Sequence, residues 1–335
     1  MNVLMQFWVA FFVIIFVLSS SVSFAADRIR IGYSSLSADQ VPVWSAHAAG
    51  TYEKYGLDIE LILFGSGTLA AQALISGDIP LAGLAGPAVI NAGIAGADVV
   101  MVLGGTNVMP YWIVSKPGIR TAEQLKGKKI AIARFGSSSD FAARYAVSRL
   151  GLNPDKDVVI LQIGSAPARL AALEQGSVDA AAVTPPINFT SVMKGYYKIA
   201  DLAEMGLAYP MQGLVTTRAY LSSRREVVKR ASMAQIEAVA RFKNDPSFGT
   251  QVLKRYFPTL TDEIIRRTYE MFRSDQVQPR DQSPSIAAIQ TVLEEAAMKD
   301  SKMKKYNPGQ FVDMSITNEL KKEGFISQVY SVYKK

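Results

Sequence analysis

Four short loops of this chain place small and hydroxyl-bearing residues directly after an expected strand and directly before an expected helix. They are Gly65-Ser66-Gly67-Thr68, Gly86-Pro87, Gly136-Ser137-Ser138-Ser139-Asp140 and Thr184-Pro185-Pro186. Helix N-termini present unpaired N–H groups and a partial positive charge, which suits the oxyanion of a ligand. Ser and Asp are also ordinary helix-capping residues, and for any one loop the cap is the preferred interpretation. As a set, the loops predict a binding cleft for a small molecule.

One basic residue stands beside these loops. Arg134 is expected to end a strand just before Gly136, where its guanidinium could meet a carboxylate, sulfonate or phosphate. An ion pair with Asp140 is equally consistent with the spacing. Aromatic side chains near the loops mostly fill protein cores, and among them we include Trp44 in the predicted site.

The composition excludes most catalytic chemistry. The chain has no Cys and a single His, which excludes disulfides, thiolate zinc sites, iron–sulfur clusters, cysteine nucleophiles and two-histidine metal sites. His47 lies at the edge of the apolar face of an expected helix, and no G-x-S-x-G elbow exists for it to serve. The run from Gly65 to Ala70 matches a dinucleotide fingerprint but lacks the acidic residue that would hold a ribose. We therefore expect no catalytic residue, no metal and no cofactor.

The elements that must position the loops alternate between strand and helix. Strands are expected at 28–33, 58–64, 80–84, 99–103, 129–133, 158–163 and 178–183, and helices at 42–55, 68–76, 87–92, 140–150, 167–175 and 186–193. This rhythm predicts an α/β fold in which mostly parallel sheets are flanked by helices. From about Ala219 the pattern changes to amphipathic helices only, which we expect to form a helical C-terminal tail.

An internal repeat suggests that the α/β part consists of two similar lobes. When Gly65–Pro87 is laid over Gly164–Pro186 without a gap, the identities fall on the residues that start and stop the expected elements. A chain of 335 residues, 49% of them hydrophobic, is long enough for two cores. We expect lobe 1 to begin at 27–111, lobe 2 to span 112–212, and 213–335 to return to lobe 1.

The N-terminal residues 1–25 predict a signal peptide. Phe7–Leu18 is an unbroken apolar run, and Ser23 and Ala25 occupy the small-residue positions of a cleavage site after Ala25. The alternative is an uncleaved anchor, because no Lys or Arg precedes the run. Without Cys there is no acceptor for a lipid anchor. The net charge of +7 is spread along the chain, and we expect no nucleic-acid partner.

Several stretches together resemble ABC-transporter substrate-binding proteins of the nitrate/sulfonate/taurine class. The stretches are Val41-Pro42-Val43-Trp44, Gly50–Leu57, Gly65-Ser66-Gly67, Ala73–Asp78, Glu123–Ala131 and Gly136–Ser139. The likeness runs from Ile29 to about Leu221. It implies a two-lobed periplasmic-binding fold of type 2, with the chain crossing between lobes near Pro110–Ser115 and Gln212–Thr216. It also implies ligand contacts from Ser35, Gly65, Ser66, Gly67, Gly86, Pro87, Gly136, Ser137, Ser138, Thr184 and Pro185.

The resemblance implies a periplasmic solute-binding protein that delivers its ligand to an inner-membrane ABC permease. The ligand is expected to be a small anionic organic molecule such as a sulfonate, taurine, a nitrate-like ion or an aromatic acid, and the protein is expected to be a monomer that closes on it. Two alternatives stay open, a ligand-sensing subunit for a membrane receptor and a secreted enzyme of the thiamine-pyrimidine-synthase-like branch. That branch depends on cysteine and histidine residues, which disfavours it here.

Overall fold

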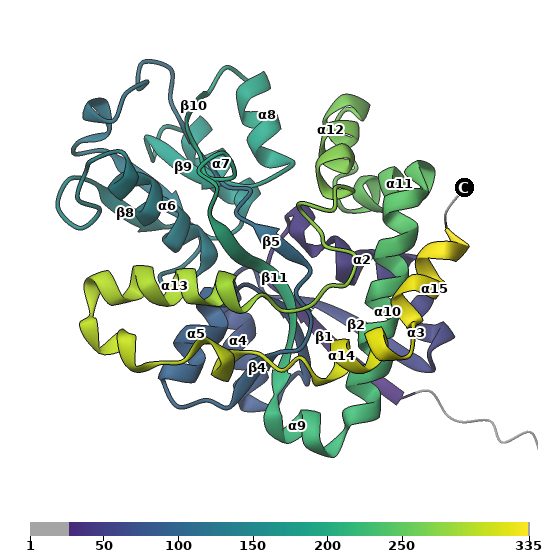
Figure 1. Ribbon diagram of the computed structural model, residues 1–335. Helices are drawn as coiled ribbons and strands as arrows, with labels where there is room; N and C mark the ends of the chain where they lie inside the picture. Colours follow the sequence, from purple (N-terminus) through teal and green to yellow (C-terminus); the bar gives the residue numbers. More distant parts are fainter. Residues whose placement is uncertain (1–26, 334–335) are drawn as a thin grey trace, which may run out of the picture.

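The computed structural model describes residues 27–333, so the signal peptide expected at 1–25 lies outside the described residues. Two β-sheets form the centre of the molecule, and helices pack around them (Figure 1). The first sheet has the strand order β2 (Leu57–Leu63), β1 (Asp27–Tyr33), β3 (Leu81–Leu84), β11 (Ala208–Thr217), β4 (Val99–Met101). The second has the order β8 (Val159–Gln162), β7 (Lys129–Ile132), β9 (Ala180–Val183), β6 (Trp112–Ser115), β10 (Tyr197–Asp201).

The α/β fold class predicted from the sequence is confirmed, and both sheets prove to be mixed. β1 pairs in parallel with β2 and β3, and β7 pairs in parallel with β8 and β9. β11 and β6 are antiparallel to their neighbours, because each enters its sheet as the chain arrives from the other one. The strands β6, β10 and β11 were not expected from the pattern.

The first connection between the sheets overlaps the start of the segment that the resemblance implied, and the second lies earlier along the chain. Residues 112–115 form β6 and are paired with β9 throughout, and residues 213–217 are paired with β3 and β4. The connections instead join β5 (Thr106–Val108) to β6, and β10 to β11. β5 pairs antiparallel with the first half of β11 through Ala208↔Val108 and Gln212↔Thr106, so the two connections meet the first sheet on neighbouring strands. Residue 212, where we expected lobe 2 to end, falls inside β11.

The two halves of the sequence repeat fold alike. Ser66 caps α4 (Gly67–Ser76) by accepting from Leu69 N at 3.3 Å, and Ser165 caps α7 (Ala166–Glu174) by accepting from Ala168 N at 3.4 Å. Each helix is followed by a glycine with positive φ, Gly77 at 83° and Gly176 at 79°. The repeat therefore encodes the same helix start and the same left-handed stop in both sheets.

Replacing either stop glycine by alanine should cost about 1 kcal/mol of folding stability. A Cβ at Gly77 would meet nothing within 4 Å, and one at Gly176 only the Lys116 ammonium at 3.8 Å, so left-handed backbone strain is the main cost. Urea unfolding of Gly77→Ala and Gly176→Ala measures it. A free energy of unfolding equal to that of the parent protein would show that these positions are not helix stops.

Helices cover both sheets, with one break that the pattern did not predict. The helix expected at 42–55 is divided into α2 (Val41–Ala48) and α3 (Thr51–Lys54), because Gly50 adopts a left-handed φ of 67°. The remaining α-helices of the two lobes are α5 (Gly86–Ile94), α6 (Ser138–Arg149) and α8 (Ile187–Met193). Two short 3-10 helices, η1 (Ala38–Gln40) and η2 (Glu123–Leu125), complete this part.

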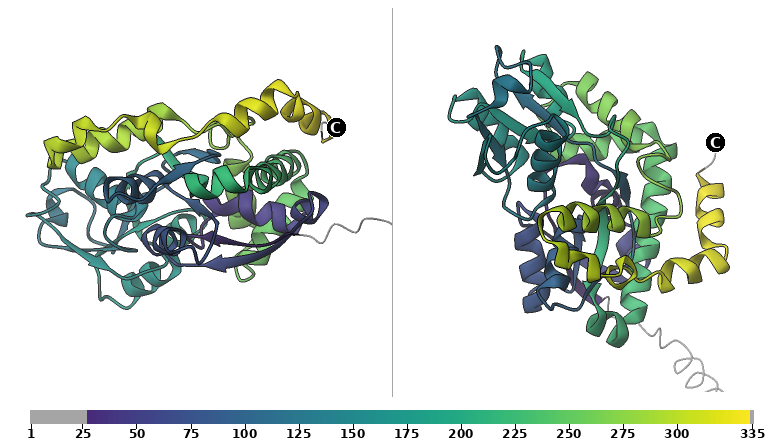
Figure 2. Two further views of the ribbon diagram at one scale, coloured as in Figure 1. Left: turned by 90° about the horizontal axis from the view of Figure 1, so that it is seen from below. Right: turned by 60° about the vertical axis from the view of Figure 1, so that its left-hand side comes forward.

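The C-terminal third is helical, as expected, and runs over both halves of the molecule. Its helices are α9 (Arg218–Ser223), α10 (Arg225–Asn244), α11 (Pro246–Tyr256), α12 (Asp262–Phe272), α13 (Ile286–Lys299), α14 (Ser315–Lys322) and α15 (Phe325–Val332), with 3-10 turns η3 (Ser301–Lys305) and η4 (Pro308–Phe311). α10 packs on α2 and α3, whereas α13 packs on α5 and β11. Figure 2 shows the segment from α13 to α15 extending along one side of the molecule. Within residues 27–333, no helix is both long enough and apolar enough to span a bilayer.

Candidate ligand-binding site

A small cavity lies between the two sheets, at the carboxyl ends of their parallel strands. Its lining includes residues that closely follow β1, β2, β7, β8 and β9, which is where open α/β sheets bind ligands. The cavity has a volume of about 20 Å³ in this arrangement, roughly enough for one water molecule. The lining residues are Ser34, Ser35, Asp39, Gly65, Ser66, Gly67, Tyr111, Ala133, Ser137, Ser138, Ser139, Ser165, Ala166, Arg169, Thr184 and Met211.

Three helices start at the cavity. α4, α6 and α7 have their N-cap residues Ser66, Ser137 and Ser165 in its lining, and the helices are 10, 12 and 9 residues long. Their first turns bring backbone N–H groups and positive partial charge from both sheets to one place. The arrangement favours a negatively charged group in the cavity.

Arg169 adds a full positive charge to the cavity. The residue lies in the first turns of α7, is only 3% exposed, and donates from Nη1 to the carbonyl of Gly164 at 2.6 Å. Its Nε has no hydrogen-bond partner, and no ion pair of Arg169 occurs within residues 27–333. Burial lowers the pKa of the guanidinium, an effect that the neighbouring Tyr111 phenol opposes. Arginine nevertheless stays protonated in proteins, so the cavity holds a buried cation without a carboxylate partner.

Asp39 brings the opposite charge to the cavity from the first sheet's side. This residue of η1 is 1% exposed, and its Oδ2 accepts from Gln40 Nε2 at 2.7 Å. Its Oδ1 has no hydrogen-bond partner. Burial raises the pKa of Asp39 to about 6, against the opposing effect of hydrogen bonds from Ser37 and Gln40. The carboxyl group therefore titrates close to neutral pH.

The structure brings seven of the predicted ligand contacts together in this cavity. They are Ser35, Gly65, Ser66, Gly67, Ser137, Ser138 and Thr184. Ser138 shares a hydrogen bond of 3.1 Å with the Tyr111 hydroxyl. The Ser137 hydroxyl is engaged within its own loop, since it donates to Arg134 O at 2.7 Å and lies 2.9 Å from Ser139 Oγ. Ser137 therefore shapes the loop as well as lining the cavity.

Trp44 does not reach the cavity. Its side chain is fully buried and stacks on Tyr256 of α11, with ring centroids 3.9 Å apart and planes 10° from parallel. Tyr33 and Phe257 meet the indole edge to face. Trp44 thus belongs to the core between α2 and the helical tail, because a partner more than 200 residues away covers it.

Arg134 also lies outside the cavity. The residue is exposed, and the carboxylate that the spacing offered to it, Asp140, instead pairs with Arg144 at 2.6 Å within α6. Asp140 also accepts from the backbone N–H of Gly136 at 2.9 Å and so fixes the turn before the helix. The basic residue of the cavity is Arg169, not Arg134.

Four further predicted contacts lie outside the cavity lining. Pro87 and Gly136 lie in a neighbouring groove, described below, and a Cβ at Gly86 would come within 2.3 Å of the Pro210 ring. Pro185 acts through its carbonyl, which accepts from Ala38 N at 3.0 Å. These positions serve the contact between the sheets and not the cavity lining.

Direct hydrogen bonds hold the two sheets together around the cavity. Besides Ala38 N to Pro185 O, Thr68 Oγ1 donates to Phe135 O at 3.3 Å and Asn91 Nδ2 donates to Gly136 O at 3.1 Å. The donors belong to the first sheet's side and the acceptors to the second's. The structure therefore shows a closed arrangement, and a ligand larger than a water molecule requires the sheets to move apart.

Sequence reasoning missed the two charged residues of the cavity. Arg169 was hidden within an expected helix, although it is the only charged residue between Ala166 and Leu173 and therefore interrupts an otherwise apolar segment. Asp39 lies six residues after β1 and is not part of the four loops from which the binding site was predicted. Arg169 could have been identified from the sequence, because it is a charged residue in an otherwise apolar stretch of a helix that follows a strand.

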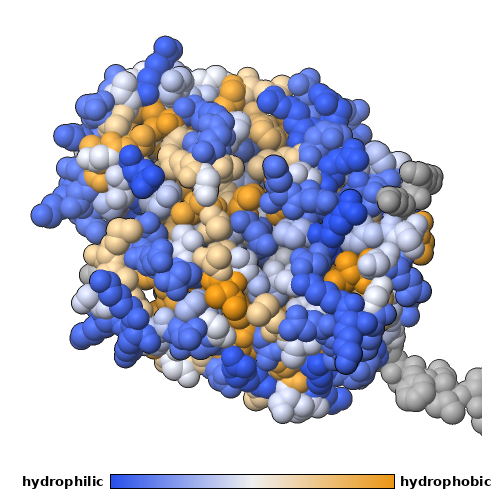
Figure 3. Space-filling model, in the orientation of Figure 1, coloured by the Kyte–Doolittle hydropathy of each residue, from blue (hydrophilic) through white to orange (hydrophobic). Residues whose placement is uncertain are grey.

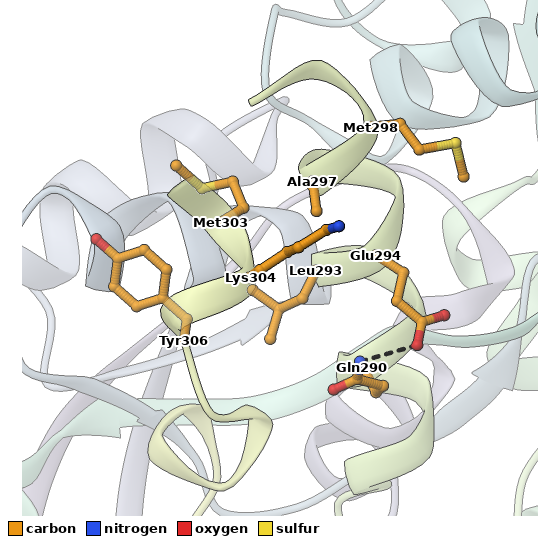
Figure 4. A pocket seen from close by; sticks show the side chains of 8 residues that line it. All are labelled: Gln290, Leu293, Glu294, Ala297, Met298, Met303, Lys304 and Tyr306. Carbon is orange, nitrogen blue, oxygen red and sulfur yellow. Dashed lines mark hydrogen bonds between the residues drawn. The ribbon is translucent and has the colours of Figure 1, made fainter. Parts of the chain in front are cut away.

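Two larger cavities are formed by the described residues, and the second of them borders the loops that follow β3 and β7. One, of about 420 Å³, sits inside the hairpin of α13 and η3, where Gln290 donates to Glu294 at 2.8 Å (Figure 4). The other is a groove of about 360 Å³ between α5, α6 and α13. The hairpin cavity is built by residues 290–306 alone, so a movement between the sheets would not change it.

The outer surface carries no metal cluster in the described part of the chain. Among residues 27–333, no group of three or more His, Asp or Glu side chains is placed to hold a metal ion. Figure 3 shows hydrophilic side chains over most of one face, with apolar side chains gathered at its upper left, over the second sheet.

Comparison with known structures defines the class of fold. The alkanesulfonate-binding protein SsuA from Xanthomonas axonopodis pv. citri, solved bound to MOPS, superposes with a TM-score of 0.73 at 23% identity, over 86% of this chain and 98% of that one. The fold is thus the two-lobed fold of periplasmic binding proteins, as the resemblance implied. The chain belongs to the NMT1-like family, whose sequence model matches residues 25–255.

Proteins of similar sequence are named as binding proteins. A protein of Brucella abortus named as a binding protein is 27% identical over 164 residues, which are 48% of this chain and 50% of the relative. A protein of Brachyspira hyodysenteriae named as an ABC transporter periplasmic binding protein is 24% identical over 221 residues, 61% of this chain and 62% of the relative. The chain thus spans about half the length of the Brucella relative that it matches.

Proposed function

We propose that this protein is a periplasmic solute-binding protein that captures a small anionic organic molecule between its two sheets and presents it to an inner-membrane ABC permease. One observation carries the proposal: the buried guanidinium of Arg169 lines the cavity without a carboxylate partner in the described chain. The family and the names of its relatives support the role in import.

The cavity offers enough interactions for a useful affinity. Micromolar binding requires about 8 kcal/mol. Hydrogen bonds to a charged group contribute roughly 1.5–3 kcal/mol each, and the donors include Arg169, the hydroxyls of Ser66 and Thr184, and three helix N-termini. Four or five such bonds exceed the ordering cost of a small ligand. A sulfonate, a nitrate-like ion or an aromatic acid would meet these donors.

The remaining features of the role follow from the sequence. We propose export with cleavage after Ala25, no lipid anchor, and action as a monomer with no nucleic-acid partner. We propose that lobe 1 begins at 27–111, that lobe 2 follows from 112, and that the chain returns to lobe 1 at Ala208 and not at 213, because β11 belongs to the first sheet. The cavity is proposed to bind its ligand without transforming it.

A screen of the mature chain from residue 26 tests the proposal. Thermal-shift measurements with alkanesulfonates, nitrate, aliphatic acids and aromatic acids should reveal at least one stabilising anion, because a ligand that binds only the folded protein raises its melting temperature. Failure of every anion to stabilise the protein, in a screen where cations or sugars do, would overturn the proposal.

Binding should also change the distribution between open and closed arrangements. Because the ligand touches both sheets, it favours the closed arrangement, and the radius of gyration in solution should fall when the stabilising anion is added. Small-angle X-ray scattering with and without that anion measures this. An identical radius in both samples would count against closure by the ligand.

A further inference from the structure

We infer that the groove between α5, α6 and α13 is a second ligand site, which binds an organic amine with an apolar body. We call it the side groove, and its lining residues fall within 87–91, 136–155 and 292–298. Of these residues only Ser137 also lines the cavity between the sheets. Two properties of the lining define the occupant, an apolar wall and an excess of negative charge.

The side groove is large enough for a small organic molecule. Its volume is about 360 Å³, and volumes of roughly 300–1,000 Å³ are usual for small-molecule sites. Each of the three helices contributes an apolar side chain, Ile90 from α5, Phe141 from α6 and Val292 from α13. Phe141 also stacks on Tyr145, with ring centroids 5.9 Å apart and planes 11° from parallel, so one wall is aromatic. The groove can therefore cover an apolar body.

The charged residues of the lining leave an excess of negative charge. The described lining contains three acids, Asp140, Asp155 and Glu295, and one base, Arg144. Arg144 pairs with Asp140 at 2.6 Å and with Asp155 at 2.5 Å, so its charge is already matched. A cationic group complements the remaining charge, whereas a sulfonate or carboxylate would be repelled.

Glu295 is the acid that the amine would meet. It is half-buried on α13 and forms no hydrogen bond or ion pair with another residue of 27–333. Burial raises the pKa of its carboxyl group, and of the charged neighbours Glu294 acts in the same direction while Arg149 opposes it. A cation beside Glu295 would stabilise the carboxylate and offset part of the cost of burying it. We therefore place the ammonium group of the occupant at Glu295 and its apolar body along Phe141.

The two walls of the side groove belong to different sheets (Figure 1). α5 and α13 both contact β11 of the first sheet, whereas α6 contacts β7 and β9 of the second. Asn91 and Gly136 join the walls through the hydrogen bond of 3.1 Å described above, and both line the groove. The walls must therefore separate when the sheets move apart, so an amine bound here favours the closed arrangement.

This geometry couples the side groove to the cavity. On the proposed function, an anion in the cavity favours the same closed arrangement. Two ligands that favour one arrangement raise each other's affinity by the same factor. The coupling rests on the proposed function, whereas the amine site by itself does not.

The experiment is isothermal titration calorimetry of the mature chain with two probes of one shape, 2-phenylethylamine and 2-phenylethanol. At about pH 8 the carboxyl groups are ionised and the amine is protonated. We expect the amine to bind about tenfold or more tightly than the alcohol, and Glu295→Gln to weaken the amine about fivefold or more, because the charge that the ammonium meets is lost. Glu294→Gln, which removes the neighbouring acid that lines the hairpin cavity, should keep the affinity within about twofold.

Two further variants locate the bound amine. Ala296→Phe places a large side chain in the side groove and should abolish binding of the amine. Asp39→Asn removes the acid of the cavity between the sheets and should leave the affinity for the amine within about twofold. Thermal unfolding of each variant establishes that it is folded at the temperature of the titration.

The outcomes separate this inference from the proposed function. Binding of neither probe, an alcohol that binds as tightly as the amine, or amine binding that survives in Glu295→Gln would overturn the inference and leave the anion-binding function standing. Saturation with the stabilising anion from the screen should raise the affinity for the amine about threefold or more. An unchanged affinity would overturn the coupling. If the screen finds no anion, the proposed function fails, and the two probes still decide the amine site.

Discussion

Replacing Arg169 by glutamine should weaken binding of an anionic ligand by about 2–3 kcal/mol, or roughly 30- to 150-fold, because hydrogen bonds to a charged group contribute that much. Glutamine retains a polar end but removes the positive charge that the cavity otherwise leaves unpaired. Calorimetric titration with the stabilising anion from the screen measures the change.

The matched control is Arg134→Gln, which removes the exposed arginine that the sequence suggested in place of Arg169. Its affinity should stay within twofold of the parent protein. Because Arg169 also donates to Gly164 O, thermal unfolding of Arg169→Gln establishes that the variant is folded at the temperature of the titration. A folded Arg169→Gln that binds the anion as tightly as the parent would remove Arg169 from the site.

The second prediction concerns how the folding stability depends on pH through Asp39. The pKa of Asp39 is about 6 in the folded protein against an ordinary value of 3.8, so the folded state binds more protons than the unfolded state between these values. The Asp39 contribution therefore makes stability fall as pH rises from about 4 to 6, and the loss is complete above the folded pKa. A change in pKa from 3.8 to about 6 corresponds to about 3 kcal/mol.

Asp39→Asn isolates this contribution. Carboxylates whose pKa is lowered, such as Asp179 beside Lys129 and Lys116 and Asp275 beside Lys243, act in the opposite sense, so the total pH profile mixes both. The difference in unfolding free energy between Asp39→Asn and the parent, measured in urea at pH 4, 5, 6, 7 and 8, should increase in favour of the variant by about 3 kcal/mol and then level off. A difference that does not change with pH would mean that Asp39 is not buried as an isolated carboxyl group.

Much of the local structure could be predicted because neighbouring residues determine it. Ser66 and Ser165 begin helices, and Gly77 and Gly176 end them, through contacts within a few residues along the chain. The strands that alternate with those helices follow from apolar runs of ordinary length. These elements account for the fold class and for six of the seven predicted residues that line the cavity, while the seventh, Ser35, came from the family resemblance.

The strands β6, β10 and β11 were not predicted from the sequence, and β11 shows why: its local pattern is weak and its pairing partners are distant. β11 contains Pro210 and Gly213, which weaken a strand pattern, and its partners Leu84 and Met101 lie more than 100 residues away. A Cβ at Gly213 would stand 2.2 Å from Leu103 O, so the glycine is required by a close approach that only the assembled sheet creates.

The sequence by itself determined where strands turn into helices, which small residues start those helices, and that two similar halves exist, because caps and turns depend on contacts within one helical turn. Only the tertiary structure decided that Arg169 and Asp39 share a cavity, that Trp44 is covered by Tyr256, and that Arg134 faces away. Charge and burial at a site depend on which distant segments pack against it, and that packing is a property of the whole fold.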